Sequence, residues 1–177
     1  MEKVEASSTA WLNLTLEVMA RQGLLLVSSK PGEKPNVMTI GWGTIGLVWG
    51  KDIFAVLVRP SRYTFNLIEA SGEFTVNVPA ADMQEITNYC GTVSGRDHDK
   101  FREKKVTPAK SQTVSVPIIE ECLIHYECRV VHKNDVVARN LTPEIESGCY
   151  GGSDYHRVYF GEIMRTCTAR DVEQRLR

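Results

Sequence analysis

The sequence predicts a single domain that is mostly β with short helices, folded as a closed or split barrel. Short apolar runs of strand character recur along the chain, and turns rich in Gly and Pro separate them. The helical segments are few and short. No linker or internal repeat divides the 177 residues, a length that can bury one core. This pattern favours a barrel over a doubly wound parallel sheet.

The first predicted helix covers residues 12–21, where apolar residues recur at helical spacing. Ser8 or Thr9 is expected to cap its start, and Gly23 to end it. A strand follows at residues 24–29. The later elements expected in chain order are a turn at 30–33, strands at 37–42 and 52–58, a short helix at 65–70, a strand at 73–78, a helix at 81–89, a polar turn or short helix at 99–105, a loop-rich stretch at 106–117, a strand at 124–131, a second loop-rich stretch at 138–153 and a strand at 158–168.

Some side chains carry expectations of their own. In residues 73–78 apolar side chains alternate, which predicts a strand buried on one face. Trp49 is interpreted as a core aromatic, and His125 and His132 as residues on the surface of a strand. Cys128 and Cys167 fall within strand-like runs and are expected in the core.

Arg59, Ser61, Arg62, Tyr63 and Thr64 lie between a predicted buried strand and a short helix. Free backbone N–H groups and the positive end of the helix dipole meet at such a junction. Arginine adds forked donors that match phosphate oxygens. The segment therefore suits an anion site. An ordinary surface loop capped by Ser61 or Thr64 explains these residues equally well.

Charge and hydropathy exclude several classes of function. The formal net charge is −1, with 21 basic and 22 acidic residues, and no basic strip is present, so nucleic acid is not an expected partner. No apolar run is long enough to span a bilayer, and the N-terminus does not resemble a secretory signal. We therefore expect a cytoplasmic protein with no membrane partner.

Motifs for metal and dinucleotide binding are not supported. The five cysteines form no Cys-x-x-Cys pair, and adjacent residues such as Asp97, His98 and Asp99 rarely converge on one ion, so no metal is expected. Residues 41–46 match Gly-x-Gly-x-x-Gly by letter, but strand-like residues follow where a dinucleotide site needs a helix. Cys90 is interpreted as buried filler rather than a redox thiol.

Five motifs in a fixed order resemble the flavin reductase-like family of FMN-binding split barrels, which includes flavoredoxin. The resemblance extends from about Leu24 to Cys167. The motifs are Asn36-Val37-Met38-Thr39-Ile40-Gly41-Trp42-Gly43, Arg59-Pro60-Ser61-Arg62-Tyr63-Thr64, Gly72-Glu73-Phe74-Thr75-Val76-Asn77-Val78-Pro79, Cys90-Gly91-Thr92-Val93-Ser94-Gly95-Arg96-Asp97 with Asp99-Lys100-Phe101, and His156-Arg157-Val158-Tyr159-Phe160-Gly161-Glu162-Ile163.

The resemblance implies a set of FMN contacts. The first motif is expected to follow the flavin ring, the second to hold the phosphate, the third to lie near the ring, and the fourth to add contacts, often from a neighbouring subunit. The implied cofactor-binding residues are Thr39, Ile40, Gly41, Trp42, Gly43, Thr44, Arg59, Ser61, Arg62, Tyr63, Thr64, Asn77, Val78, Pro79, Cys90, Gly91, Thr92, Ser94, Gly95, Arg96 and Lys100.

His156 is the implied catalytic residue. The motif places it near the flavin and nicotinamide, where it would orient the nucleotide or supply a proton, because an unperturbed histidine titrates close to neutrality. Its alternative role is a polar residue at the start of a strand. The segment 140–155 departs from the simplest family pattern, and a lid there would restrict pyridine nucleotide and suit a protein electron partner.

Two functions follow from the resemblance. The first is an NAD(P)H-dependent flavin reductase that uses NADH or NADPH, and the second is a flavoredoxin-type electron carrier between redox protein partners. A related barrel that has lost flavin is a third, which the paired cations Arg59 and Arg62 argue against. The resemblance also implies a homodimer with FMN at the interface.

Overall fold

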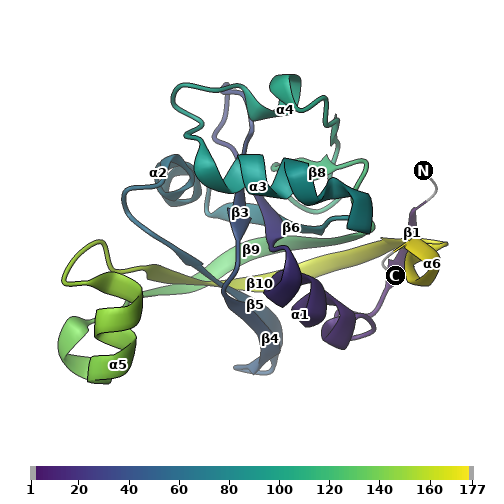
Figure 1. Cartoon of the computed structure of the whole chain (residues 1–177). Coiled ribbons are helices and arrows are strands. Elements are labelled where there is room, and N and C mark those ends of the chain that lie inside the picture. The colour runs from purple at the N-terminus through teal and green to yellow at the C-terminus, as the bar shows by residue number, and fades with distance from the viewer. Residues whose placement is uncertain (1–2, 176–177) are drawn as a thin grey trace.

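One antiparallel sheet organises the computed structural model, which describes residues 3–175 (Figure 1). The strand order is β3-β2-β6-β9-β10-β5-β4, and β1 pairs with β10. The strands are β1 (Lys3–Ala6), β2 (Leu24–Ser28), β3 (Asn36–Ile40), β4 (Gly43–Val48), β5 (Lys51–Val58), β6 (Glu73–Val78), β9 (Ile124–Asp135) and β10 (Arg157–Ala169), with β7 (Pro108–Ala109) and β8 (Ile118–Ile119) forming a separate pair.

The two ends of this strand order are joined by the chain itself. Strand β3 ends at Ile40 and β4 begins at Gly43, so only Gly41 and Trp42 connect the two ends. The Cα atoms of Ile40 and Gly43 are three chain steps apart, which spans at most about 11 Å. The sheet must therefore curl until these ends meet, which gives a split barrel and confirms the predicted fold class.

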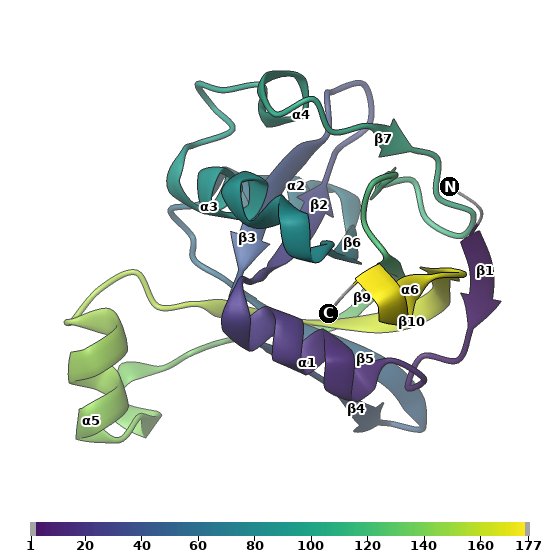
Figure 2. The ribbon, with the colours of Figure 1, turned by 45° about the vertical axis from the view of Figure 1, so that its right-hand side comes forward.

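The described helices are short. They are α1 (Leu12–Arg21), α2 (Tyr63–Ser71), α3 (Gln84–Thr92), α4 (Lys100–Glu103), α5 (Pro143–Ile145) and α6 (Val172–Arg175). Helices α2, α3 and α4 gather beside β3, whereas α5 projects away from the rest of the molecule (Figures 1 and 2). None of the described helices has the length and apolar character needed to cross a bilayer.

Most predicted elements are confirmed, with boundaries that shift by a few residues. The helix over 12–21 is present, and Gly23 follows its last turn with φ +84°. The expected cap is wrong, because Trp11 occupies the N-cap position and no side chain caps the helix. The short helix after Arg62 also has no side-chain cap, so Ser61 and Thr64 do not serve that role.

Three expectations about burial are wrong. Residues 74–78 are buried on both faces of β6, because this central strand is covered on both sides. His125 is fully buried in the neighbouring strand β9, where Nδ1 pairs with Asn77 Oδ1 at 2.9 Å. Trp49 is 63% exposed, because it lies in the turn after β4 with φ +54°. Cys128 and Cys167 are buried as predicted.

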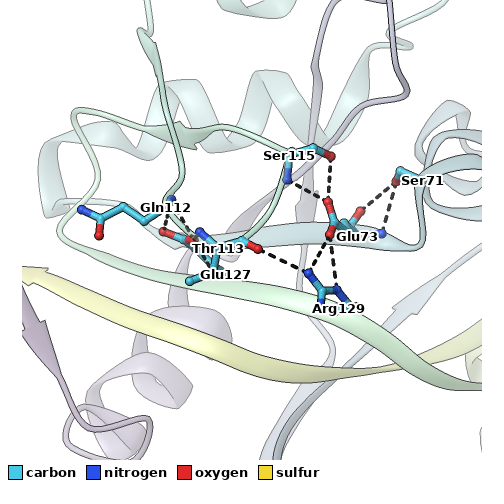
Figure 3. A network of polar contacts seen from close by, with 7 residues as sticks. All are labelled: Ser71, Glu73, Gln112, Thr113, Ser115, Glu127 and Arg129. Atoms are coloured by element: carbon cyan, nitrogen blue, oxygen red, sulfur yellow. Dashed lines mark hydrogen bonds and ion pairs between the residues drawn. The ribbon is translucent and has the colours of Figure 1, made fainter.

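Two carboxylates on the sheet anchor the predicted loop at 106–117 (Figure 3). Glu127 accepts hydrogen bonds from the backbone N–H groups of Gln112 and Thr113 and from the Thr113 hydroxyl, at 2.6–3.2 Å. Glu73 accepts from the N–H and hydroxyl of Ser115, both at 2.7 Å. A loop without regular structure is thus fixed by side chains of two adjacent strands.

The hairpin of β9 and β10 extends beyond the barrel as an arm. Its tip carries the single turn α5 and a π-helical turn at Glu146–Tyr150, and neither contains a buried residue. The sequence predicted only a loop-rich stretch here. Because the tip has no core of its own, its position depends on contacts near its base.

Candidate functional site

Two adjoining cavities open where the barrel edge meets α2 and the loop after α3. The larger has a volume of about 440 Å³ and the smaller about 220 Å³. Met38, Arg59 and Arg62 line both, so the two cavities lie side by side. The larger is also lined by Asn36, Ser61, Tyr63, Thr64, Thr92, Val93, Ser94, Gly95, Arg96, Lys100 and Asp154, and the smaller by Thr39, Ile40, Gly41, Trp42, Leu57 and His156.

Four cationic side chains surround the larger cavity, against one carboxylate. Arg62 forms the N-cap of α2, and among the described residues its guanidinium has no hydrogen bond or ion pair. The first N–H groups of α2 likewise lack acceptors within the helix. An anion in this cavity would therefore meet a guanidinium and amide groups that no described residue satisfies.

Lys100 lies beneath the same cavity and is 4% exposed. Its ammonium donates to the carbonyl oxygens of Val37, at 2.8 Å, and Cys90, at 2.9 Å, and no described carboxylate pairs with it. Burial, together with the nearby charge of Arg62, lowers the pKa of Lys100 to about 8. A bound anion would compensate this buried charge.

Arg59 and Ser61 are engaged with the base of the arm. The Arg59 guanidinium donates to the carbonyl oxygens of Cys149, at 2.7 Å, and Asp154, at 3.0 Å. The Asp154 carboxylate accepts from Ser61, at 3.2 Å from the backbone N and 2.6 Å from the hydroxyl. In this conformation Arg62, rather than Arg59, presents free donors to the cavity.

The loop after α3 closes the larger cavity from the other side. Arg96 donates to Ser61 O at 3.0 Å, and its guanidinium lies 5.6 Å from the centre of the Tyr63 ring. Gly95 approaches Asn36 so closely that a Cβ atom would lie 1.9 Å from Asn36 Oδ1. A glycine is thus required for the loop to pack here.

His156 lies at the smaller cavity and is 8% exposed. Its Nδ1 is 3.0 Å from the Tyr150 hydroxyl, and its ring centre is 5.0 Å from that of Trp42. Burial, and next the positive charge of Arg59, lower the pKa of His156 to about 4. The side chain is therefore neutral at pH 7 in this conformation.

Not all of the predicted cofactor residues reach the cavities. Asn77 is fully buried and bonds to Leu25 O, Ile119 N and His125, so its amide faces the core. Val78 and Pro79 are also buried, and Gly43 and Thr44 continue into β4. Gly91 packs near Thr39. None of these six residues lines either cavity.

Cys90 is a seventh predicted residue that contributes no side chain to the cavities. Its thiol is buried, and burial raises the thiol pKa to about 11, as expected of a residue that only packs in the core. The Cys90 carbonyl, however, holds Lys100. The backbone of this residue thus positions a charge that faces the larger cavity.

Sequence reasoning missed Asn36, Met38, Leu57, Val93 and Asp154 as lining residues. The first three alternate with core residues in β3 or β5. Asp154 belongs to a distant loop, and no local pattern connects it to Ser61. Among the described residues, no group of three or more His, Cys, Asp or Glu side chains is arranged to hold a metal ion.

Comparison with known proteins gives a match to the family described as "Flavin reductase like domain" over residues 19–176. An uncharacterized protein of Archaeoglobus fulgidus is 36% identical over 132 residues, which are 75% of this chain and 64% of that protein. The chain thus matches less than two thirds of the length of this curated relative.

Two solved structures are similar in fold. A flavoredoxin from Methanosarcina acetivorans is 28% identical with a TM-score of 0.66, covering 85% of this chain and 70% of that one. The flavoredoxin of Desulfovibrio vulgaris is 23% identical with a TM-score of 0.68, covering 84% and 70%. At these sequence identities the similarity concerns mainly the fold.

Proposed function

Because this chain belongs to the flavin reductase-like domain family, we propose that it is an FMN-binding oxidoreductase that takes electrons from NADH or NADPH. The observation that carries this proposal is the cationic lining of the 440 Å³ cavity, where the Arg62 guanidinium and the start of α2 offer free donors and no described carboxylate neutralises the buried Lys100. A dianionic phosphate matches these donors. The similar flavoredoxin of Methanosarcina acetivorans supports a flavin as the ligand.

Each group has a role that its position permits. Arg62 and the first amides of α2 bind the phosphate, while Lys100 supplies a second charge from below. Thr64 accepts from Asn36 Nδ2 at 2.8 Å, which leaves its hydroxyl hydrogen for an acceptor in the cavity. The exposed link of Gly41 and Trp42 presents backbone groups to the ring. When bound, FMN supplies an acceptor for hydride or electrons at ring atom N5.

A second function is favoured by the base of the arm. Tyr150 bonds to His156, and its ring lies 6.4 Å from that of Trp42, so the arm borders the smaller cavity. A pyridine nucleotide would have to bind beside the flavin ring, where Tyr150 of the arm already borders the smaller cavity. A flavoredoxin-type carrier, which exchanges electrons with protein partners and does not turn over NAD(P)H, needs less room beside the ring.

The absorbance spectrum and steady-state turnover separate these proposals. We expect the purified protein to bind FMN, with flavin absorbance in the visible range, and to oxidise NADH or NADPH. Binding of FMN without turnover by either nucleotide would favour the carrier. Failure to bind FMN at micromolar concentration would contradict both.

Changing His156 to Ala should slow reduction of bound flavin by NADH or NADPH about tenfold and change FMN affinity less than about threefold. The neutral imidazole can orient a ligand through one hydrogen bond, worth roughly 0.5–1.5 kcal/mol, but at pH 7 it holds no extra proton to donate. Stopped-flow measurement of flavin absorbance reads this rate.

The matched variant is His156→Gln, whose amide can still pair with Tyr150 and should retain most of the rate. A loss of about 100-fold or more in His156→Ala, with a rate that titrates near pH 7, would show that the histidine is charged when it acts. A parent-like rate would limit His156 to a structural role.

The affinity for FMN should fall as the pH rises above about 8. Lys100 has a lowered pKa of about 8 in the free protein, and a bound phosphate raises it, so binding takes up a proton above pH 8. Below that pH the lysine is charged in both states and the affinity should be level. Fluorescence titrations from pH 6.5 to 9.5 test this, with Lys100→Met as the control that should lose the dependence.

We also propose a homodimer, because the outer sheet face exposes large apolar side chains. Leu47 is 73% exposed, and Trp49 is 63% exposed although its ring lies 5.5 Å from that of His132 and 5.9 Å from that of Phe160. A two-fold partner would cover these groups. Light scattering should give twice the chain mass of 19.9 kDa, and Trp49→Glu should shift it toward the monomer. A monomer with full flavin occupancy would contradict this.

A further inference from the structure

The carboxylate of Asp154 lies where the phosphate site begins. Its Oδ1 is 3.2 Å from the backbone N of Ser61, and its Oδ2 is 2.6 Å from the Ser61 hydroxyl. Asp154 comes from the base of the arm, 93 residues away in sequence. A negatively charged side chain of the protein therefore uses the donors of Ser61, which lines the larger cavity next to Arg62.

The same segment is held by a cation of the site. Arg59 donates to the carbonyls of Cys149 and Asp154, and its guanidinium lies 5.2 Å from the centre of the Tyr150 ring. The nearest approach of Arg59 to the Asp154 carboxylate is 3.9 Å. Contacts of Ser61 and Arg59 thus fasten the base of the arm to the larger cavity.

We propose that Asp154 is a specificity-determining residue that competes with the flavin phosphate for Ser61. The proposal rests on the proposed function of the cavity. A dianionic phosphate and the Asp154 carboxylate repel each other and cannot both accept from the same N–H and hydroxyl. Binding of a phosphorylated flavin displaces the carboxylate and loosens the segment 149–154, whereas riboflavin leaves both in place.

The local structure permits this exchange. Asp154 has φ +53°, and Gly151 and Gly152 before it also have positive φ, so the chain turns sharply within four residues. The Asp154 side chain is 31% exposed, and the adjoining π-helical turn has no buried residue. Moving the segment therefore uncovers no core, and its displacement breaks exposed polar contacts and the ring contacts of the partly exposed Tyr150.

The affinity ratio of FMN to riboflavin tests the proposal. Asp154→Asn keeps the size of the side chain and the tolerance for positive φ but removes the charge. We expect it to bind FMN about threefold to tenfold more tightly than the parent, with riboflavin affinity unchanged. Asp154→Gly, which also accepts positive φ, should give an equal or larger gain. Quenching of flavin fluorescence measures both ligands.

Asp97→Asn is the matched control. Asp97 lines the neighbouring cavity beside Arg96 but makes no contact with Ser61. If Asp97→Asn increases the affinity for FMN as much as Asp154→Asn does, the gain comes from the general loss of negative charge and the proposal fails. Unchanged or weaker FMN binding in Asp154→Asn also overturns it. If the parent and all variants bind neither flavin, the proposed function has failed instead.

Hydrogen exchange gives a readout that does not depend on affinity. In the parent, FMN should increase amide exchange in residues 149–155, although ligands usually slow exchange where they bind, and riboflavin should not. Asp154→Asn should show the faster exchange before any ligand is added. Slower exchange of this segment with FMN would mean that the carboxylate stays on Ser61 and would overturn the proposal.

Discussion

An Arg62→Ala variant should bind FMN roughly tenfold to a hundredfold more weakly than the parent, while riboflavin affinity changes less than about twofold. Arg62 borders both cavities, and its guanidinium has no other partner among the described residues. A charge-assisted hydrogen bond is worth roughly 1.5–3 kcal/mol, and each 1.4 kcal/mol is about a factor of ten in affinity. Because riboflavin has no phosphate, fluorescence titration with both ligands isolates this contact.

Two further variants sharpen the result. Arg62→Lys keeps the charge but loses the forked donors, so it should fall between the parent and Arg62→Ala. Lys34→Ala removes a cation that is 83% exposed and paired with Asp99, and it should change FMN affinity by less than about twofold. Equal losses for FMN and riboflavin in Arg62→Ala would place the phosphate elsewhere.

Replacing Glu127 by Ala should lower the free energy of unfolding by about 3–5 kcal/mol and the melting temperature by about 10 °C. The Glu127 carboxyl is 1% exposed, and it accepts from the loop donors of Gln112 and Thr113 (Figure 3). It also accepts from the Arg165 guanidinium. Removal of the carboxyl leaves these backbone and guanidinium donors without the acceptor that fixes the loop to the sheet. Urea unfolding followed by circular dichroism measures the change.

Glu127→Gln separates charge from shape. Glutamine fills the same volume as glutamate, but its N–H₂ group would face donors of the loop. We therefore expect the free energy of unfolding to fall by only about 1–3 kcal/mol. Glu144→Ala, on the exposed tip of the arm, should change the free energy of unfolding by less than about 0.5 kcal/mol. A loss below about 1 kcal/mol in Glu127→Ala would mean that the loop finds other acceptors.

The sequence predicts correctly those structural features that depend only on residues close together in the chain. Helical spacing located the helix at 12–21, and Gly23 with its positive φ ends that helix as predicted. The segment from Arg59 to Thr64 was recognised as a strand-to-helix junction from adjacent residues alone. Such features depend on backbone geometry over a few residues, which the local sequence encodes.

Burial of single side chains was harder to predict, because it depends on what packs against a strand. Alternation in residues 73–78 suggested one buried face, but β6 is covered on both. Asn77 belongs to a motif that the family resemblance places near the flavin ring, yet its side-chain amide hydrogen-bonds to His125 in the core. Trp49 was expected inside, and the turn after β4 places it on the surface.

The sequence by itself determined the barrel class, the order of most elements and the strand-to-helix junction at Arg62, where we propose that an anion binds. Only the tertiary structure brought Lys100 beneath that junction, lowered the pKa of His156 by burial and placed Asp154 on Ser61. The reason is physical. Propensity and capping act within one or two turns of the chain, whereas burial and charge pairing depend on contacts between residues far apart in sequence, and the curled sheet alone decides which of these meet.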